Sequence, residues 1–147
     1  MNDEQITLPQ AFVERMRENL GTEAEAFFAS YESPRAYGLR RNPLKQTAKQ
    51  FEQMMPWQLT PVSWADEGYY YPDTDRPGKH VYHEMGLYYI QEPSAMCVAQ
   101  IADPRPGEAV LDLCAAPGGK STQLAGRMAG EGLLVCNEIV PNRAKIL

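Results

Sequence analysis

A buried strand, a tight turn and the start of a helix follow one another between Val110 and Thr122. The strand is apolar around Asp112, the turn is built from Ala, Pro and Gly after a cysteine, and the helix continues to about Met128. A second apolar strand, residues 133–136, ends in Asn-Glu. This order is typical of a doubly wound α/β sheet, which binds nucleotide-like ligands at the carboxyl ends of its strands. The sequence therefore predicts an α/β fold with a ligand site at this turn.

Two other kinds of glycine-rich loop do not match. A phosphate-binding loop of the type G-x-x-x-x-G-K-[ST] would need a glycine at position 114, which is a cysteine. A dinucleotide loop of the type G-x-G-x-x-G fails because Gly119 directly follows Gly118, and the next glycine is Gly126. The short turn that remains has no spare amides for a pyrophosphate, so it suits a cofactor that carries adenosine without phosphates. S-adenosylmethionine is such a cofactor.

The roles at this predicted site follow from residue type. Small turn residues let the backbone approach the methionine and sugar of the cofactor. Lys120 would reach the cofactor carboxylate or cap a neighbouring loop, and Glu138 would accept hydrogen bonds from the ribose hydroxyls unless it is a solvated strand-end carboxylate. Asp112 is a charge inside an apolar strand, so we expect loop amides to satisfy it and the residue to hold the turn, with a cofactor contact as the second interpretation. The predicted cofactor-binding residues are Cys114, Ala115, Ala116, Pro117, Gly118, Gly119, Lys120 and Glu138.

Three sequence blocks in matching order and spacing carry a family resemblance: Gln91–Met96, Cys114–Lys120, and Asn137-Glu138 with Asn142-Arg143. Together they resemble the RNA cytosine-C5 methyltransferases of the Sun/Fmu type, strongly over residues 88–147 and weakly before. The resemblance implies a Rossmann-like domain that methylates cytosine C5 in RNA with S-adenosylmethionine. The acidic N-terminal segment is similar to the branch that modifies ribosomal RNA. The resemblance also implies that Ser94 and Met96 shape the floor beneath the cofactor.

Residues 110–147 leave room for two strands, because each strand–helix unit takes roughly 30 residues. A complete sheet of this class has more strands, so we expect the N-terminal part of a longer protein. The family's catalytic cysteines lie in Pro-Cys and Thr-Cys loops, and none of Cys97, Cys114 and Cys136 follows Pro or Thr. We therefore predict no catalytic residue in this stretch, and we interpret the three cysteines as buried structural thiols. The alternative function is a non-catalytic RNA-binding or interaction module, which would have no reason to keep this turn and Glu138.

Basic residues gather in one short segment, although a net charge of −5 and a pI of about 5.0 would by themselves count mildly against nucleic-acid binding. The first 32 residues hold seven acids and two bases, whereas residues 34–50 hold five bases and no acid. Such a segment suits an RNA backbone, or it is a solvated face that offsets the acidic helix before it. The predicted RNA-binding residues are Arg35, Arg40, Arg41, Lys45 and Lys49.

Proline, glycine and cap residues predict a small α+β domain that guides RNA in residues 1–92, followed by the first part of the cofactor domain in residues 93–147. Thr22, with Glu25 three residues later, and Thr47 are the predicted N-caps of two helices. We expect helices at residues 8–20, 22–30, 48–55 and 93–102 and one that opens near the end. We expect strands at residues 37–42, 59–64, 68–71 and 87–91, and an exposed loop at residues 72–84.

Other side chains give weaker signals. His80 and His83 lie beside Glu84, but no second cluster of ligands supports a metal, so no metal site is predicted. The aromatic residues Trp57, Trp64 and 69–71 pack a small core, with base stacking as the alternative.

The remaining expectations concern location and partners. No apolar stretch approaches the roughly 18 residues of a membrane span. Unpaired cysteines without a signal sequence indicate a reducing compartment, the cytoplasm. We expect RNA as the partner, no membrane and a monomeric full-length protein. The isolated stretch should either self-associate through its apolar strands or leave the residues after about Pro106 poorly ordered.

Overall fold

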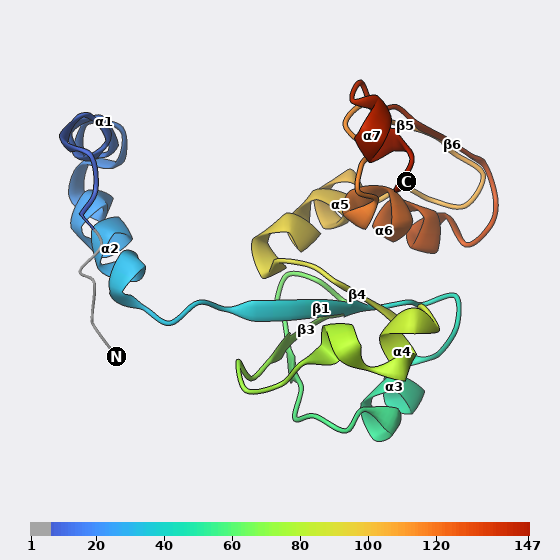
Figure 1. The fold of residues 1–147 in the computed structure, drawn as a ribbon. Coiled ribbons are helices and arrows are strands. Elements are labelled where there is room, and N and C mark those ends of the chain that lie inside the picture. The colour runs from blue at the N-terminus through green and yellow to red at the C-terminus, as the bar shows by residue number, and fades with distance from the viewer. Residues whose placement is uncertain (1–6) are drawn as a thin grey trace. The chain divides into compact units, whose positions relative to one another are not determined.

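The computed structural model describes residues 7–147. Two compact units divide between Arg35 and Ala36 (Figure 1), and each is described by itself. The predicted domain boundary between residues 92 and 93 falls inside the second unit, and this division into domains stays a prediction. Within the described residues, no helix combines the length and the apolar character that crossing a membrane requires.

The first unit is helical. Helix α1 (Gln10–Leu20) ends where predicted, at Gly21, whose φ of +52° is a conformation that favours glycine. A 3₁₀ turn, η1 (Gly21–Glu23), leads into α2 (Ala24–Ala29) and a second turn, η2 (Ser30–Glu32). The predicted capping box at Thr22 is wrong, because Thr22 lies inside the 3₁₀ turn and the helix begins without a side-chain cap. Phe27 joins the helices, with ring centroids 6.2 Å from Phe12 and 5.5 Å from Tyr31.

The second unit begins with a four-stranded antiparallel sheet in the order β2–β3–β1–β4. Its strands are β1 (Tyr37–Arg41), β2 (Thr60–Pro61), β3 (Gly68–Tyr71) and β4 (Tyr88–Ile90). All four lie inside the predicted ranges. In the central strand, Leu39 pairs with Tyr69 on one side and with Ile90 on the other. Successive side chains of a strand point to opposite faces, so Leu39 and Arg40 serve two different layers.

One face of this sheet is covered by a short helix and carries the apolar core. Helix α3 (Ala48–Met54) has the capping box that the sequence predicts, with Thr47 and Gln50 bonding each other's backbone. The helix places Phe51 against Tyr69, at a centroid distance of 5.3 Å, and against Tyr88, at 6.2 Å. Leu39 and Phe51 are fully buried. Tyr69 is thus a core residue, as the packing interpretation expected.

Residues 72–84 contain more structure than the predicted loop. They include a 3₁₀ turn, η3 (Pro77–Lys79), and helix α4 (Val81–Glu84). The hydroxyl of Tyr88 donates to the Pro77 carbonyl at 2.9 Å, and Nδ1 of His80 accepts the Tyr82 amide at 3.2 Å. The expectation of a loop is therefore wrong for residues 77–84. A buried tyrosine and a histidine cap order a segment whose composition is poor in apolar residues.

The other face of the sheet carries the second layer, which Figure 1 shows above β1 and β4. This layer comprises η4 (Pro93–Met96), α5 (Cys97–Ala102), β5 (Ala109–Asp112), α6 (Gly119–Met128), β6 (Leu133–Cys136) and α7 (Pro141–Ala144). Strands β5 and β6 are parallel, with Val110 paired to Leu134, and α6 connects them. This is the first βαβ unit of a Rossmann-like fold, so the predicted fold class is confirmed. The expected last helix is α7, which ends before Lys145 and the apolar residues Ile146 and Leu147.

The cysteines correct one interpretation. Cys97 is partly buried, but Cys114 and Cys136 are exposed. The buried-thiol interpretation is therefore wrong for these two, which lie at the carboxyl ends of the parallel strands: Cys114 in the turn after β5 and Cys136 as the last residue of β6. Leu111 is 58% exposed and Leu133 is 59% exposed on the same strands.

Candidate functional site

The turn between β5 and α6 is held by Asp112. Its Oδ1 accepts the Cys114 amide at 3.1 Å, and its Oδ2 accepts the hydroxyl of Ser121 at 2.7 Å. A carboxylate at the end of an apolar strand is thereby satisfied by the loop and by the first turn of the helix. The predicted role of Asp112, to hold the turn, is confirmed.

Gly118 gives the turn its shape. Its φ of +112° lies in the region that side-chain-bearing residues rarely adopt, and the residue is the N-cap of α6. The Gly118 amide donates to the Ala115 carbonyl at 2.9 Å, and the Gly118 carbonyl accepts the Thr122 amide at 2.8 Å. Ala115 and Ala116 are buried, whereas Cys114 and Pro117 are exposed. The predicted small-residue turn thus presents backbone rather than side chains at the start of a helix.

Glu138 lies beside this turn. Its side chain is only 3% exposed, which excludes the solvated-carboxylate interpretation. Oε1 accepts the Val140 amide at 2.9 Å, and Oε2 forms an ion pair with Nη1 of Arg143 at 3.3 Å. Oε2 is buried and makes no hydrogen bond among the described residues. A buried carboxylate oxygen with an unused acceptor site is suited to a hydroxyl donor such as a ribose.

Backbone and side-chain bonds tie the turn to Glu138. The Ala115 amide donates to the Asn137 carbonyl at 2.9 Å, and the Asn137 amide donates to the Asp112 carbonyl at 2.8 Å. Arg143 of α7 donates to the Ala116 carbonyl as well as pairing with Glu138. The carboxyl ends of the two parallel strands therefore form one edge that carries both halves of the predicted site.

Three further residues were assigned to the cofactor. Lys120, in the first turn of α6, is exposed. Met96 is fully buried with Val62 and Ala65 in the core of the antiparallel sheet. Ser94 is exposed and donates to the carboxylate of Glu92. The assignment of Ser94 and Met96 to a floor beneath the cofactor stays a prediction.

Arg40 occupies a place that the sequence did not indicate. It is 4% exposed, and its Nη1 donates to Gln91 Oε1 at 2.7 Å, to Gln123 Oε1 at 3.3 Å and to the Gly119 carbonyl. Its Nη2 donates to Oγ1 of Thr122 at 2.8 Å. Burial lowers the pKa of Arg40 to about 10. These bonds consume the donors that a phosphate would need, so Arg40 is corrected from an RNA contact to an internal residue.

The remaining basic residues of the predicted set differ in their exposure. Arg41 is half-buried and donates to the Gln46 carbonyl at 2.7 Å. Lys45 and Lys49 are exposed, and the Lys45 ammonium also donates to the Met85 carbonyl. Arg35 is exposed and ends the first unit. Lys45 and Lys49 are therefore the exposed cations that the second unit retains from the predicted set.

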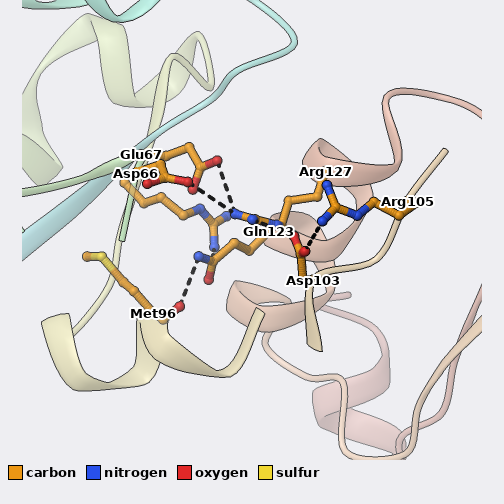
Figure 2. Close-up of polar contacts among 8 residues, drawn as sticks. Asp66, Glu67, Met96, Asp103, Arg105, Gln123 and Arg127 are labelled. Atoms are coloured by element: carbon orange, nitrogen blue, oxygen red, sulfur yellow. Dashed lines mark hydrogen bonds and ion pairs between the residues drawn. The ribbon is translucent and has the colours of Figure 1, made fainter. Parts of the chain in front are cut away.

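A second arginine, which is partly buried, is not among the residues predicted from the sequence. Arg127, 15% exposed, donates to Asp103 Oδ1 at 2.8 Å and forms ion pairs with Glu67 at 3.6 Å and Asp66 at 3.9 Å. One helical turn earlier, Nε2 of Gln123 donates to the Met96 carbonyl at 3.0 Å. Figure 2 shows Asp66 and Glu67 on one side of this network, with Asp103 on the other. The sequence does carry one signal for this network. Gln123 and Arg127 are spaced i, i+4 on the packed face of α6, where apolar residues are expected.

Comparison with known families decides where the chain belongs. The family model described as the N-terminal domain of 16S rRNA methyltransferase RsmF matches residues 8–93, which is more than half of the chain. The chain belongs to this family. A second family model, 16S rRNA methyltransferase RsmB/F, matches residues 99–147. The predicted resemblance to Sun-type methyltransferases is thereby confirmed.

Curated relatives of the RsmF family agree. The chain is 36% identical to ribosomal RNA small subunit methyltransferase F of Enterobacter sp. (strain 638), over 100% of this chain and 33% of the relative. It is 37% identical to the protein of that name from Aliivibrio fischeri (strain MJ11), over 97% of this chain and 32% of the relative. The chain thus spans about a third of the length of the curated relatives it matches.

Solved structures share the fold. A methyltransferase homologue from Pyrococcus horikoshii superposes with a TM-score of 0.83 at 30% identity, over 94% of this chain and 47% of that one. The crystal structure of NSun6 from Pyrococcus horikoshii with SFG gives a TM-score of 0.78, over 94% of this chain and 60% of that one. At 15% identity, the second similarity shows the fold alone.

Proposed function

We propose that the full-length protein is an S-adenosylmethionine-dependent methyltransferase that acts on cytosine C5 of 16S ribosomal RNA, and that this chain supplies the first part of its cofactor site. The observation that carries the proposal is the buried carboxylate of Glu138, whose Oε2 has no hydrogen-bond donor among the described residues and which adjoins a turn of small residues. Family membership supports the reaction class and the rRNA substrate.

The residues of this chain bind and orient the cofactor in this proposal. Glu138 accepts hydrogen bonds from the ribose hydroxyls, and the backbone of residues 115–119 lies against the sugar and methionine. Lys120 brings a cation to the start of α6, where the helix dipole also favours an anion such as the methionine carboxylate. Bound there, S-adenosylmethionine supplies an electrophilic methyl group.

The chemical step belongs to residues outside this chain. None of Cys97, Cys114 and Cys136 follows a proline or threonine, so none matches the family's catalytic loops. By the resemblance, the cysteine of the Pro-Cys or Thr-Cys loop adds to C6 of cytosine and makes C5 nucleophilic. Lys45 and Lys49 are exposed and guide the RNA backbone. We place the protein in the bacterial cytoplasm, together with the ribosomal RNA.

A binding assay with the full-length protein tests the cofactor site. Glu138→Ala should raise the Kd for S-adenosylmethionine about 5- to 150-fold, the range for losing hydrogen bonds to a charged group. Glu138→Gln keeps an acceptor for the Val140 amide and should lie between Ala and wild type. Glu131→Ala removes an exposed carboxylate near β6 and is the matched control. Calorimetry measures all four proteins, and a wild-type Kd in Glu138→Ala would remove Glu138 from the site.

Methyl transfer to 16S RNA, with C5-methylcytosine as the product measured, tests the reaction. The alternative, a non-catalytic RNA-binding module, predicts RNA binding without cofactor binding or transfer. Full-length protein that binds RNA but not S-adenosylmethionine would support that alternative and reject the proposed enzyme.

A further inference from the structure

Arg40 links the antiparallel sheet to the first turn of α6. The residue sits on central strand β1, 79 positions before Gly119, yet its guanidinium donates to the Gly119 carbonyl and to Thr122 Oγ1. The planar fork of an arginine can hold several acceptors in fixed directions, which an ammonium cannot. The sheet thus holds the beginning of the helix by directional bonds.

The hydrogen-bond chain continues into the turn itself. The hydroxyl of Thr122, which accepts from Arg40, donates to the Gly118 carbonyl at 2.7 Å. Gly118 is the residue whose positive φ shapes the turn. A path of two hydrogen bonds therefore runs from β1 to the residue that decides where the turn backbone lies.

Arg40 is itself held in place. Gln91 and Gln123 both accept from its Nη1, and Gln123 is fixed in turn by the bond from its Nε2 to the Met96 carbonyl. All the side chains and carbonyls that accept from Arg40 are neutral, and Glu67 acts on this charge only electrostatically, without a hydrogen bond to it. A buried cation whose hydrogen bonds all go to neutral groups is costly, which points to a positional role for those bonds.

Gly119 adds a steric constraint at the same place. A Cβ at this position would lie 3.2 Å from Cε1 of Tyr89, tighter than ordinary contact. The ring of Tyr89 also lies 5.6 Å from the Arg40 guanidinium carbon. The first residue of α6 therefore rests directly on β4 while Arg40 holds its carbonyl.

We propose that Arg40 is a positioning residue for the cofactor turn: through Gly119 and Thr122 it fixes the start of α6 and the backbone of Gly118. This inference rests on the proposed function, because it assigns to the sheet the task of pre-forming the S-adenosylmethionine site. The residue acts through the turn and does not touch the cofactor.

Cofactor affinity of the full-length protein tests this role. Arg40→Gln should raise the Kd for S-adenosylmethionine about tenfold. Arg40→Lys should raise it less, because a lysine keeps a charged donor although it reaches fewer of the acceptors. Thr122→Val removes the link to Gly118 without touching the buried charge, and should raise the Kd about threefold. Arg127→Gln is the matched control: it weakens the same layer contact farther along α6 and should leave the Kd within about twofold of wild type. Calorimetry is done at a temperature where every variant is folded.

Amide hydrogen exchange at residues 118–122 without cofactor gives a second measurement. Arg40→Gln and Thr122→Val should speed exchange there. Arg127→Gln should instead speed exchange nearer the end of α6. Wild-type Kd values in both Arg40→Lys and Thr122→Val would overturn the proposal even if Arg40→Gln fails to fold. An equal rise of the Kd in Arg127→Gln would also overturn it, because general destabilisation would then explain the effect.

The two proposals fail separately. If wild-type protein does not bind S-adenosylmethionine, the proposed function is rejected, and exchange at residues 118–122 still decides whether Arg40 positions the turn. If wild type binds and exchange in Thr122→Val and Arg40→Lys is unchanged, the positioning role is rejected and the function stands.

Discussion

Replacing Arg127 by glutamine should weaken the contact between α6 and the antiparallel sheet by about 2–4 kcal/mol. Nη1 of Arg127 lies 3.6 Å from the carboxylate of Glu67, whose side chain is 11% exposed. At an effective dielectric constant of about 20, this attraction is on the order of 5 kcal/mol, and breaking a buried pair by removing one partner costs about 3–5 kcal/mol. Arg40 is close enough to Glu67 to interact electrostatically with it, which limits the loss.

Hydrogen exchange of the α6 amides in the full-length protein measures this free energy as a local opening. Arg105→Gln is the control, since that arginine is 72% exposed and solvent screens its pair with Asp103. A double-mutant cycle with Glu67→Gln should give a coupling of about 1–3 kcal/mol. A cost below about 1 kcal/mol for Arg127→Gln, or additive effects in the cycle, would refute the reasoning.

Three further results are expected. Burial raises the pKa values of Tyr69 and Tyr88 to about 12, so the unfolded chain loses these protons near pH 10 while the folded chain keeps them, and stability should fall as the pH rises from about 10 to 12. An ultraviolet titration compared with that of Tyr69→Phe checks this, and ionisation of every tyrosine near pH 10 would contradict it. Replacing Lys45 and Lys49 by alanine should reduce the salt dependence of RNA binding by about one unit of slope for each phosphate that is no longer neutralised. An unchanged slope would show that these lysines belong to a solvated face and contact no phosphate. A polypeptide of residues 1–147 alone should self-associate through its exposed β5 and β6 side chains, and light scattering that reports a monomer would count against this.

Local chemistry made much of the architecture predictable. Thr47 with Gln50 three residues later fixes the start of α3, whereas Thr22 shows the limit of the rule, because the preceding Gly21 opens a 3₁₀ turn instead. The range of β6 agrees with its apolar run, residues 133–136. These features depend on neighbours within a few residues, which a sequence displays directly.

The site could be predicted in part for the same reason. Asp112 accepts hydrogen bonds from the turn and the helix start that follow it, so its role could be inferred from residues close to it in the sequence. The burial of Glu138 was not predictable in this way, since it depends on Arg143 and on a turn more than 20 residues earlier in the chain. Its position at the end of the second apolar strand located the residue, and the structure supplies its surroundings.

The sequence by itself determined the strand–turn–helix unit, the residues placed at its edge and the family to which the chain belongs. Only the tertiary structure decided between cations of equal charge in the same basic segment. Arg40 and Lys45 are five positions apart, yet one is buried under α6 and the other is exposed. The physical reason is that β1 directs Arg40 to the face of the sheet that α6 covers, and α6 begins 79 residues later, whereas Lys45 lies beyond the end of the strand at Arg41. A long-range packing partner, and not the local composition, therefore turned a candidate RNA contact into an internal hydrogen-bond donor.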